Sequence, residues 1–226
     1  MTAARAAAVL AVDRPPGATP YGIGPEALRL AMVEDVYEVL AGLELVDAVV
    51  ALSPAPQPGV LSVVWPGTHI VAVRAVGRDS TRRDVGGDPD EGAAAVCEVL
   101  DALLALSYAE GAVVAADAPD LPGLMVGKLW RALGRADVAV CPAVGGGLVA
   151  LAARLPVAPW LSTSGVGLDT ADAVERLRDK APANRAVAIG PGWHRLRSPG
   201  DLSLLDPGLE GWDSTRALLS GRGGNG

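Results

Sequence analysis

The fold is decided by the stretch Val113-Val114-Ala115-Ala116-Asp117-Ala118-Pro119-Asp120-Leu121-Pro122, an apolar run that ends in two acids. A short, continuous apolar run is typical of a strand covered on both faces, as in a parallel sheet. Ligands of such sheets bind beyond the carboxyl ends of the strands, and the prolines stiffen this turn. Carboxylate oxygens suit Mg²⁺ or Mn²⁺ bridging to phosphates, so Asp117 and Asp120 are candidate metal ligands. The alternative is that Asp117 only closes the turn and Asp120 caps the next helix.

Apolar runs and helical stripes alternate along the rest of the chain. Strands are expected at 6–12, 47–53, 69–76, 112–116, 138–142, 148–153 and 186–190. Helices are expected from Pro25, at 95–106 and at 123–133 before Gly134, and further helices are expected to begin near 169–170 and at 198–201, with an exposed loop at 77–92. This order predicts an α/β fold with a mostly parallel sheet and helices on both faces. We expect one domain over 1–220 and a disordered tail at 221–226.

Composition narrows the class of protein. The 226 residues hold 19 Lys and Arg against 26 Asp and Glu, a net charge of −7, which argues against broad binding of nucleic acid. No apolar run approaches the roughly 18 residues of a membrane span. The apolar start leads into Asp13 without a small-residue cleavage site, so a cytoplasmic protein is expected. Cys97 and Cys141 lack metal-ligand spacing and read as buried thiols.

The loop after the first strand is the second candidate for ligand binding. It runs Asp13-Arg14-Pro15-Pro16-Gly17-Ala18-Thr19-Pro20-Tyr21-Gly22-Ile23-Gly24, where many nucleotide-binding folds bring backbone N–H groups to a phosphate. It matches neither the dinucleotide-binding glycine pattern nor a P-loop. Arg14, Pro16, Gly17 and Tyr21 are the candidate ligand-binding residues here. The alternative is a Pro/Gly turn chosen for its geometry.

Three segments together resemble a known family: Val9 to Gly17, Leu28-Arg-Leu-Ala-Met-Val-Glu-Asp35, and Val113 to Leu121. They are similar to the cofactor-guanylyltransferase-like glycosyltransferase group of the GT-A superfamily. The resemblance spreads over about residues 6–205, and only Asp-x-Pro-Asp-Leu is fairly specific. It implies a three-layer, Rossmann-like GT-A fold with one reversed strand. It also implies a nucleotide or nucleotide-sugar as ligand.

The sequence departs from this family where the family carries its charges. Relatives have a Lys-Thr-Arg-Leu run where this chain reads Ala18-Thr19-Pro20-Tyr21. Gly145-Gly146-Gly147-Leu148 stands for Asp-Gly-Gly-Tyr, keeping Gly145 and Gly146 as candidate ligand-binding backbone. Arg195 and Arg197 stand where relatives carry two acids, which disfavours a two-metal mechanism. These arginines are candidates to bind a phosphate group in place of a metal ion. The alternative is that they are a solvated pair near a helix start.

Two further groups of residues are candidates for ligand binding or catalysis. The segment from Trp160 through Ser162 and Thr163 resembles the acceptor-side Trp-Ser-Thr of relatives, where the ring stacks and the hydroxyls bind sugar or phosphate. The alternative is a buried Trp before a helix start. His194 is a candidate general base, although a lone histidine with no visible partner is more often structural.

Two functional hypotheses follow. The first is a divergent GT-A-fold transferase that binds a nucleotide or nucleotide-sugar and transfers a nucleotidyl or glycosyl group with at most one Mg²⁺ or Mn²⁺. In it, Asp117 contacts the metal or ribose, and Arg195 and Arg197 balance the charge of the phosphates. The second is a catalytically degenerate GT-A domain that serves as a binding, regulatory or assembly module. The sequence is compatible with a homodimer and favours neither nucleic acid nor membrane as partner.

Overall fold

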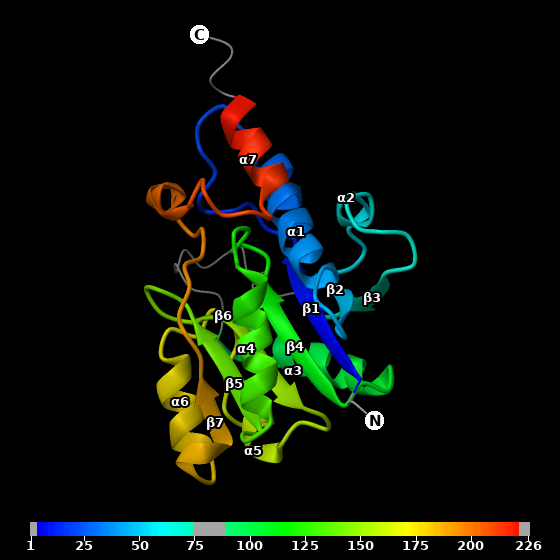
Figure 1. Cartoon of the computed structure of the whole chain (residues 1–226), viewed down its shortest axis with the longest axis vertical. Coiled ribbons are helices and arrows are strands. Elements are labelled where there is room, and N and C mark those ends of the chain that lie inside the picture. Colours follow the sequence, from blue (N-terminus) through cyan, green and yellow to red (C-terminus); the bar gives the residue numbers. More distant parts are fainter. Residues whose placement is uncertain (1–3, 75–88, 222–226) are drawn as a thin grey trace.

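The computed structural model describes residues 4–74 and 89–221, with the side chains of 89–91 left aside. In chain order its elements are β1 (Arg5–Val12), α1 (Pro25–Ala41), β2 (Asp47–Ser53), α2 (Pro58–Leu61), β3 (His69–Ala72), α3 (Pro89–Ala105), β4 (Glu110–Ala115), α4 (Gly123–Leu133), β5 (Val138–Pro142), β6 (Leu148–Arg154), α5 (Pro159–Ser162), α6 (Ala173–Lys180), η1 (Asn184–Ala186), β7 (Val187–Ile189), η2 (Pro199–Leu204) and α7 (Asp213–Ser220). Figure 1 shows them coloured along the chain.

One seven-stranded sheet runs through the molecule in the order β3-β2-β1-β4-β6-β5-β7. β1 pairs in parallel with β2 and β4, whereas β6 runs antiparallel to both β4 and β5. This confirms the α/β class and the single reversed strand that the resemblance implied. Because β6 is reversed, it begins at the edge where its neighbours end, and the loops after β1, β4, β5 and β7 all meet at that edge.

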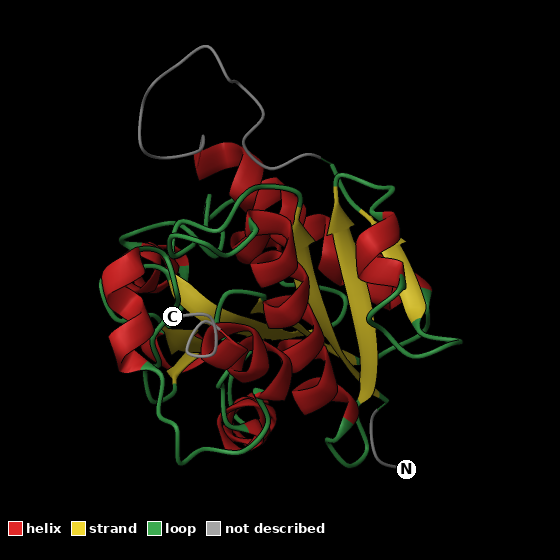
Figure 2. Ribbon diagram, turned by 90° about the horizontal axis from the view of Figure 1, so that it is seen from above, coloured by secondary structure: helices red, strands yellow, loops and turns green. Residues whose placement is uncertain are grey.

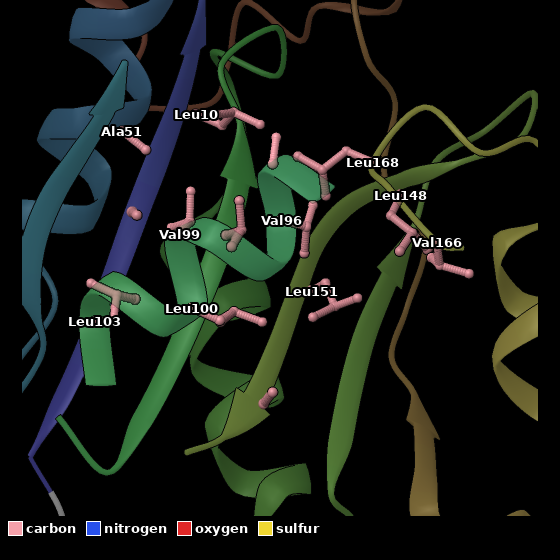
Figure 3. Packing of buried hydrophobic residues seen from close by; sticks show 14 of the residues in the cluster. Leu10, Ala51, Val96, Val99, Leu100, Leu103, Leu148, Leu151, Val166 and Leu168 are labelled. Atoms are coloured by element: carbon pink, nitrogen blue, oxygen red, sulfur yellow. The ribbon is translucent and has the colours of Figure 1, made fainter. Parts of the chain in front are cut away.

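Helices cover both faces of the sheet because its strands are apolar on both sides. Even-numbered positions of β1 pack with α3, α5 and α6, and odd-numbered positions pack with α1, α2 and α4. The first of these layers is shown in Figure 3, where α3 lays its apolar side chains over the strands, and Figure 2 shows the sheet between its helices. Alanine, valine and leucine fill most of both layers, as the low aromatic content of 4% predicts.

A third, smaller cluster joins the carboxyl-terminal part of the chain to the first loop. α7 lies along α1 (Figure 1), and Trp212 and Leu196 pack with Leu28, Met32 and Ala18. Asp35 on α1 is buried, and its carboxylate accepts hydrogen bonds from two backbone N–H groups in the first turn of α7. The helical spacing of Leu28, Met32 and Val36 predicts that Asp35 lies toward the other, polar side of α1, and this is wrong because α7 covers Asp35.

Other boundaries differ modestly from expectation. The helix expected near 169–170 begins at Ala173, and the first residues of the loop expected at 77–92 that the structure describes, 89–92, are helical. The rest of that loop, the last two residues of the strand expected at 69–76, and residues 222–226 of the expected tail lie outside the described residues. α2, α5 and α7 were not predicted. Within the described ranges, no helix is long and apolar enough to cross a bilayer.

Candidate functional site

A cavity of about 470 Å³ opens at the carboxyl edge of the sheet, where the loops meet. Its walls come from the first loop, α1, the end of β4, and the segments at 168–169 and 195–197. The residues that line it are Leu10, Val12, Arg14, Pro15, Pro16, Gly17, Arg29, Met32, Val33, Gly92, Ala115, Ala116, Asp117, Leu168, Asp169, Arg195, Leu196 and Arg197. Most of this wall is apolar, and its charged side chains other than Arg29 form one cluster, which makes up the charged side of the cavity.

Arg195 is the centre of the charged side. Its Nε and Nη2 donate to the two carboxylate oxygens of Asp117 at 2.5 and 3.0 Å, so the pair is bidentate. Its Nη1 donates to the carbonyls of Leu148 and Leu168 at 3.1 and 3.0 Å and lies 2.9 Å from Asp169 Oδ1. Burial acts to lower the pKa of Arg195, but Asp117 and Asp169 outweigh it and hold that pKa above the ordinary value. The guanidinium is therefore a fixed internal cation.

Asp169 is shared by three arginines. Besides Arg195 it receives Arg14 Nη2 on Oδ2 at 2.9 Å, and Arg197 Nη2 lies 3.6 Å from its Oδ1. Burial acts to raise the pKa of Asp169, but Arg195 and Arg14 outweigh this effect and lower it. The Arg14 side chain is 47% exposed, so Arg14 is the cation of this side that a ligand reaches most directly. The Arg197 side chain is 34% exposed, but its Nε and Nη2 are buried and have no hydrogen-bond partner.

Backbone contacts hold Arg197 and the first loop together. Arg197 Nη1 donates to the carbonyl of Gly146 at 2.8 Å, in a turn where three consecutive glycines have positive φ. The glycine turn thus orients an arginine, while Gly145 and Gly146 themselves lie outside the cavity lining. Gly17 packs so closely against the Arg197 backbone that a Cβ would overlap its carbonyl oxygen. Pro16 and Gly17 therefore form one wall of the cavity, as a tight turn rather than as a charged clamp.

Asp120 belongs to a separate buried group. Trp193 Nε1 donates to its Oδ1 at 3.2 Å, and His194 Nε2 lies 2.9 Å from the same oxygen. The Trp193 and His194 rings stack with centroids 4.9 Å apart. Asp120 is not a side-chain cap of α4, because the N-cap position is Pro122 and has no such hydrogen bond. Neither Asp120 nor His194 lines the cavity. The sequence could not show that Asp120 is the partner of His194, because the two residues are 74 positions apart.

The remaining sequence candidates lie away from the cavity lining. Tyr21 is 97% exposed. Trp160 sits on the short helix α5, where it packs against the layer of α3 and α6. Ser162 and Thr163 are exposed at the end of α5, and the Thr163 hydroxyl donates to backbone carbonyls of its own turn.

Solved structures identify the architecture, whereas no protein-family model and no curated protein matches the sequence. A Desulfovibrio desulfuricans G20 protein assigned as a nucleotide-diphospho-sugar transferase is similar over 97% of this chain and 98% of its own, at 16% identity and a TM-score of 0.68. The chain has the nucleotide-diphospho-sugar transferase fold. Two further solved structures are similar to this chain at lower TM-scores. They are 4-diphosphocytidyl-2C-methyl-D-erythritol synthase (17% identity, 95% and 98% covered, TM-score 0.54) and CMP:2-keto-3-deoxy-manno-octonic acid synthetase complexed with CTP (14%, 96% and 99%, 0.51). At these identities the likeness concerns the fold alone.

On this transferase fold the carboxylates do not fit a divalent cation as they stand. Asp117 has both oxygens engaged by Arg195, and Asp120 faces Trp193 and His194. In the part of the chain that the structure describes, no three His, Cys, Asp or Glu side chains gather as metal ligands. The metal pair expected from the sequence at Asp117 and Asp120 is therefore not assembled.

Sequence reasoning missed two residues of this cavity. Asp169 was read only as part of a helix start, although an acid directly after buried Leu168 in a glycine-rich segment is a usable signal. Arg29 was read as part of α1, yet it lines the cavity while bonded to Glu26 and to Gln57 at 2.7–2.8 Å. Its charge is met by Glu26, so it shapes the wall rather than offering a free cation.

Proposed function

We propose that the chain binds the phosphate group of a nucleotide or nucleotide-sugar in this cavity and transfers a nucleotidyl or glycosyl group. The observation that carries the proposal is the pair Arg14 and Arg197 in the lining of a mostly apolar cavity on this fold: Arg14 is 47% exposed, and Arg197 has two buried N–H groups, Nε and Nη2, without a hydrogen-bond partner. Among the similar structures, the octonic acid synthetase was solved with CTP, and the fold is shared with it.

The two sides of the cavity suit the two parts of such a ligand. Guanidinium groups bind phosphate oxygens with charge-assisted hydrogen bonds, and Arg14 and Arg197 both line the cavity beside Asp169. The apolar wall, with Met32, Leu168 and others, suits the flat surface of a base or the carbon skeleton of a sugar.

Transfer would rest on positioning and electrostatics. An acceptor oxygen attacks phosphorus or the anomeric carbon, the bond to the leaving phosphate oxygen breaks, and that oxygen keeps the electron pair. The acceptor's proton passes to solvent. Arg14 and Arg197 stabilise the charge that gathers on the leaving phosphate, which is the kind of interaction that lowers such barriers.

Calorimetric titration tests the binding claim. CMP, UMP, GMP, AMP, UDP-glucose, GDP-mannose, CTP and GTP are titrated into the protein in buffer with MgCl₂. For the probes that bind, we expect Arg197→Gln and Arg14→Gln each to weaken affinity by about tenfold to a hundredfold, since each removes a charge-assisted hydrogen bond of about 1.5–3 kcal/mol.

Arg131→Gln is the matched control, because Arg131 is exposed at the end of α4 and the change removes the same charge. It should leave affinity unchanged. If no probe binds the wild-type protein, or if the control weakens binding as much as the two cavity variants, the proposal is overturned.

A second candidate is a binding module on the same fold that performs no transfer. The specific observation in its favour is that Asp117, the acid best placed at the carboxyl edge, is fully engaged by Arg195. The two candidates part in a turnover assay in which ³¹P NMR follows a probe that binds. Release of a nucleotide or phosphate product supports transfer or hydrolysis, and unchanged ligand at saturating protein supports the module.

A further inference from the structure

We infer that this cavity binds its ligand without a divalent cation, because Arg195 takes the position beside Asp117 that a metal ion would need. This inference rests on the proposed nucleotide site and names the chemistry of its ligand: a phosphate or diphosphate group with about two negative charges, as in a nucleotide-sugar that donates a glycosyl group, and not the metal-complexed triphosphate that nucleotidyl transfer would use.

The first support is the geometry at Asp117. A cation that bridged this carboxylate to a phosphate would need at least one of its two oxygens, and each already accepts an N–H of Arg195. Arg195 cannot turn aside cheaply, because its third nitrogen is bonded to the carbonyls of Leu148 and Leu168 and its side chain is only 5% exposed. A divalent ion here would also stand against a fixed guanidinium, and like charges at such range repel strongly.

The second support is that, among the residues that the structure describes, no other acid in the cavity is free to bind a metal. Asp169 is engaged by Arg14 and Arg195, with Arg197 close by. Asp120 is buried outside the cavity. Across the described residues, each acid that lines the cavity is thus paired with arginine.

The third support is the net charge of the site. Among the lining residues, three arginines (14, 195 and 197) face two aspartates (117 and 169), and the charge of Arg29 is met by Glu26. One positive charge remains. It complements a phosphate monoester, which carries about two negative charges near neutral pH, or the diphosphate of a nucleotide-sugar. A triphosphate brings more negative charge than the site can balance without a metal.

The titration series is therefore repeated in EDTA. We expect nucleoside monophosphates or the two nucleotide-sugars to bind with a Kd that changes by less than about twofold, well under the factor of ten that 1.4 kcal/mol would give. We expect CTP and GTP to bind more weakly than these in EDTA. Binding of any probe that needs MgCl₂ overturns the inference and leaves the proposed function standing. No binding in either buffer overturns the proposed function, and this inference with it.

A direct metal titration gives an independent result. Mn²⁺ is titrated into the wild-type protein, with and without a bound probe, and free Mn²⁺ is followed by electron paramagnetic resonance. We expect the same free Mn²⁺ as with Asp101→Asn, a control on the exposed side of α3. Mn²⁺ binding that disappears in Asp117→Asn overturns the inference.

Arg195→Gln completes the test. It frees Asp117 from its guanidinium, so we expect this variant to gain Mn²⁺ binding that the wild-type protein lacks. If it folds, as judged by circular dichroism, and gains none, Arg195 is not what keeps a metal out and the inference is overturned. If it does not fold, the wild-type titrations decide the question alone.

Discussion

Replacing Asp117 with Ala should destabilise the protein by about 3 kcal/mol, because it leaves the Arg195 charge buried with part of its compensation gone. Removing one partner of a buried ion pair typically costs about 3–5 kcal/mol. We expect the lower end of that range, because Arg195 keeps Asp169 and the carbonyls of Leu148 and Leu168. For a chain of this size each kcal/mol shifts Tm by about 2–4 °C, so Tm should fall by about 6–12 °C.

Urea unfolding followed by circular dichroism measures this loss, with differential scanning calorimetry for Tm. The double variant Asp117→Leu, Arg195→Met replaces the pair with apolar groups and should lose less stability than Asp117→Ala alone. Asp101→Ala, on an exposed position of α3, should stay within about 0.5 kcal/mol of wild type. A loss below about 1 kcal/mol for Asp117→Ala, the range of exposed ion pairs, would refute the reasoning that this pair is a buried structural cation site.

Three further predictions concern neighbouring parts of the molecule. Burial raises the pKa of Asp35 from 3.8 to about 6, so the folded state keeps a proton that the unfolded state loses, and this stabilisation fades as pH rises through about 6. Asp35→Asn should remove that fall in urea midpoint. Gly17→Ala should lower Tm and weaken nucleotide binding, because its Cβ overlaps the Arg197 carbonyl oxygen. Asp169→Asn should tighten binding of phosphate-bearing probes in calorimetry, since that carboxylate competes with phosphate for Arg14 and Arg197.

Each of these has a result that speaks against it. An unchanged pH slope in Asp35→Asn would mean that this carboxyl does not titrate as its burial indicates. Gly127→Ala is the control for Gly17→Ala, because a Cβ there meets no atom within 4 Å. It should not lower Tm, and equal losses in both variants would exclude a clash at Gly17 as the cause. Weaker binding in Asp169→Asn would show that Asp169 supports the ligand rather than competing with it.

The layout of the fold was readable because its signals are local. Continuous apolar runs marked the strands at 47–53 and 138–142 to the residue, and the helix at 123–133 ended at Gly134 as its spacing and glycine indicated. The same local rule failed at Asp35. Asp35 is buried because α7 covers it, and Thr215 of α7 lies 180 residues further along the chain. The spacing of apolar residues within one helix does not show which distant helix packs against its polar side.

The sequence predicted several residues of the candidate site but not the contacts between them. The sequence singled out Asp117, Arg195 and Arg197, and the structure brings all three to one cavity. It gave no reason to pair Asp117 with Arg195 across 78 positions, because that contact is created by the loops meeting at one sheet edge.

The most direct test of the site is a crystal structure of the protein with a bound nucleoside monophosphate or nucleotide-sugar, grown in the presence of EDTA. We predict phosphate oxygens at about 2.7–2.9 Å from the guanidinium nitrogens of Arg14 and Arg197, with Asp117 still bonded to Arg195. A ligand whose phosphate lies away from both arginines, or that is seen only after a divalent ion has displaced Arg195 from Asp117, would contradict it.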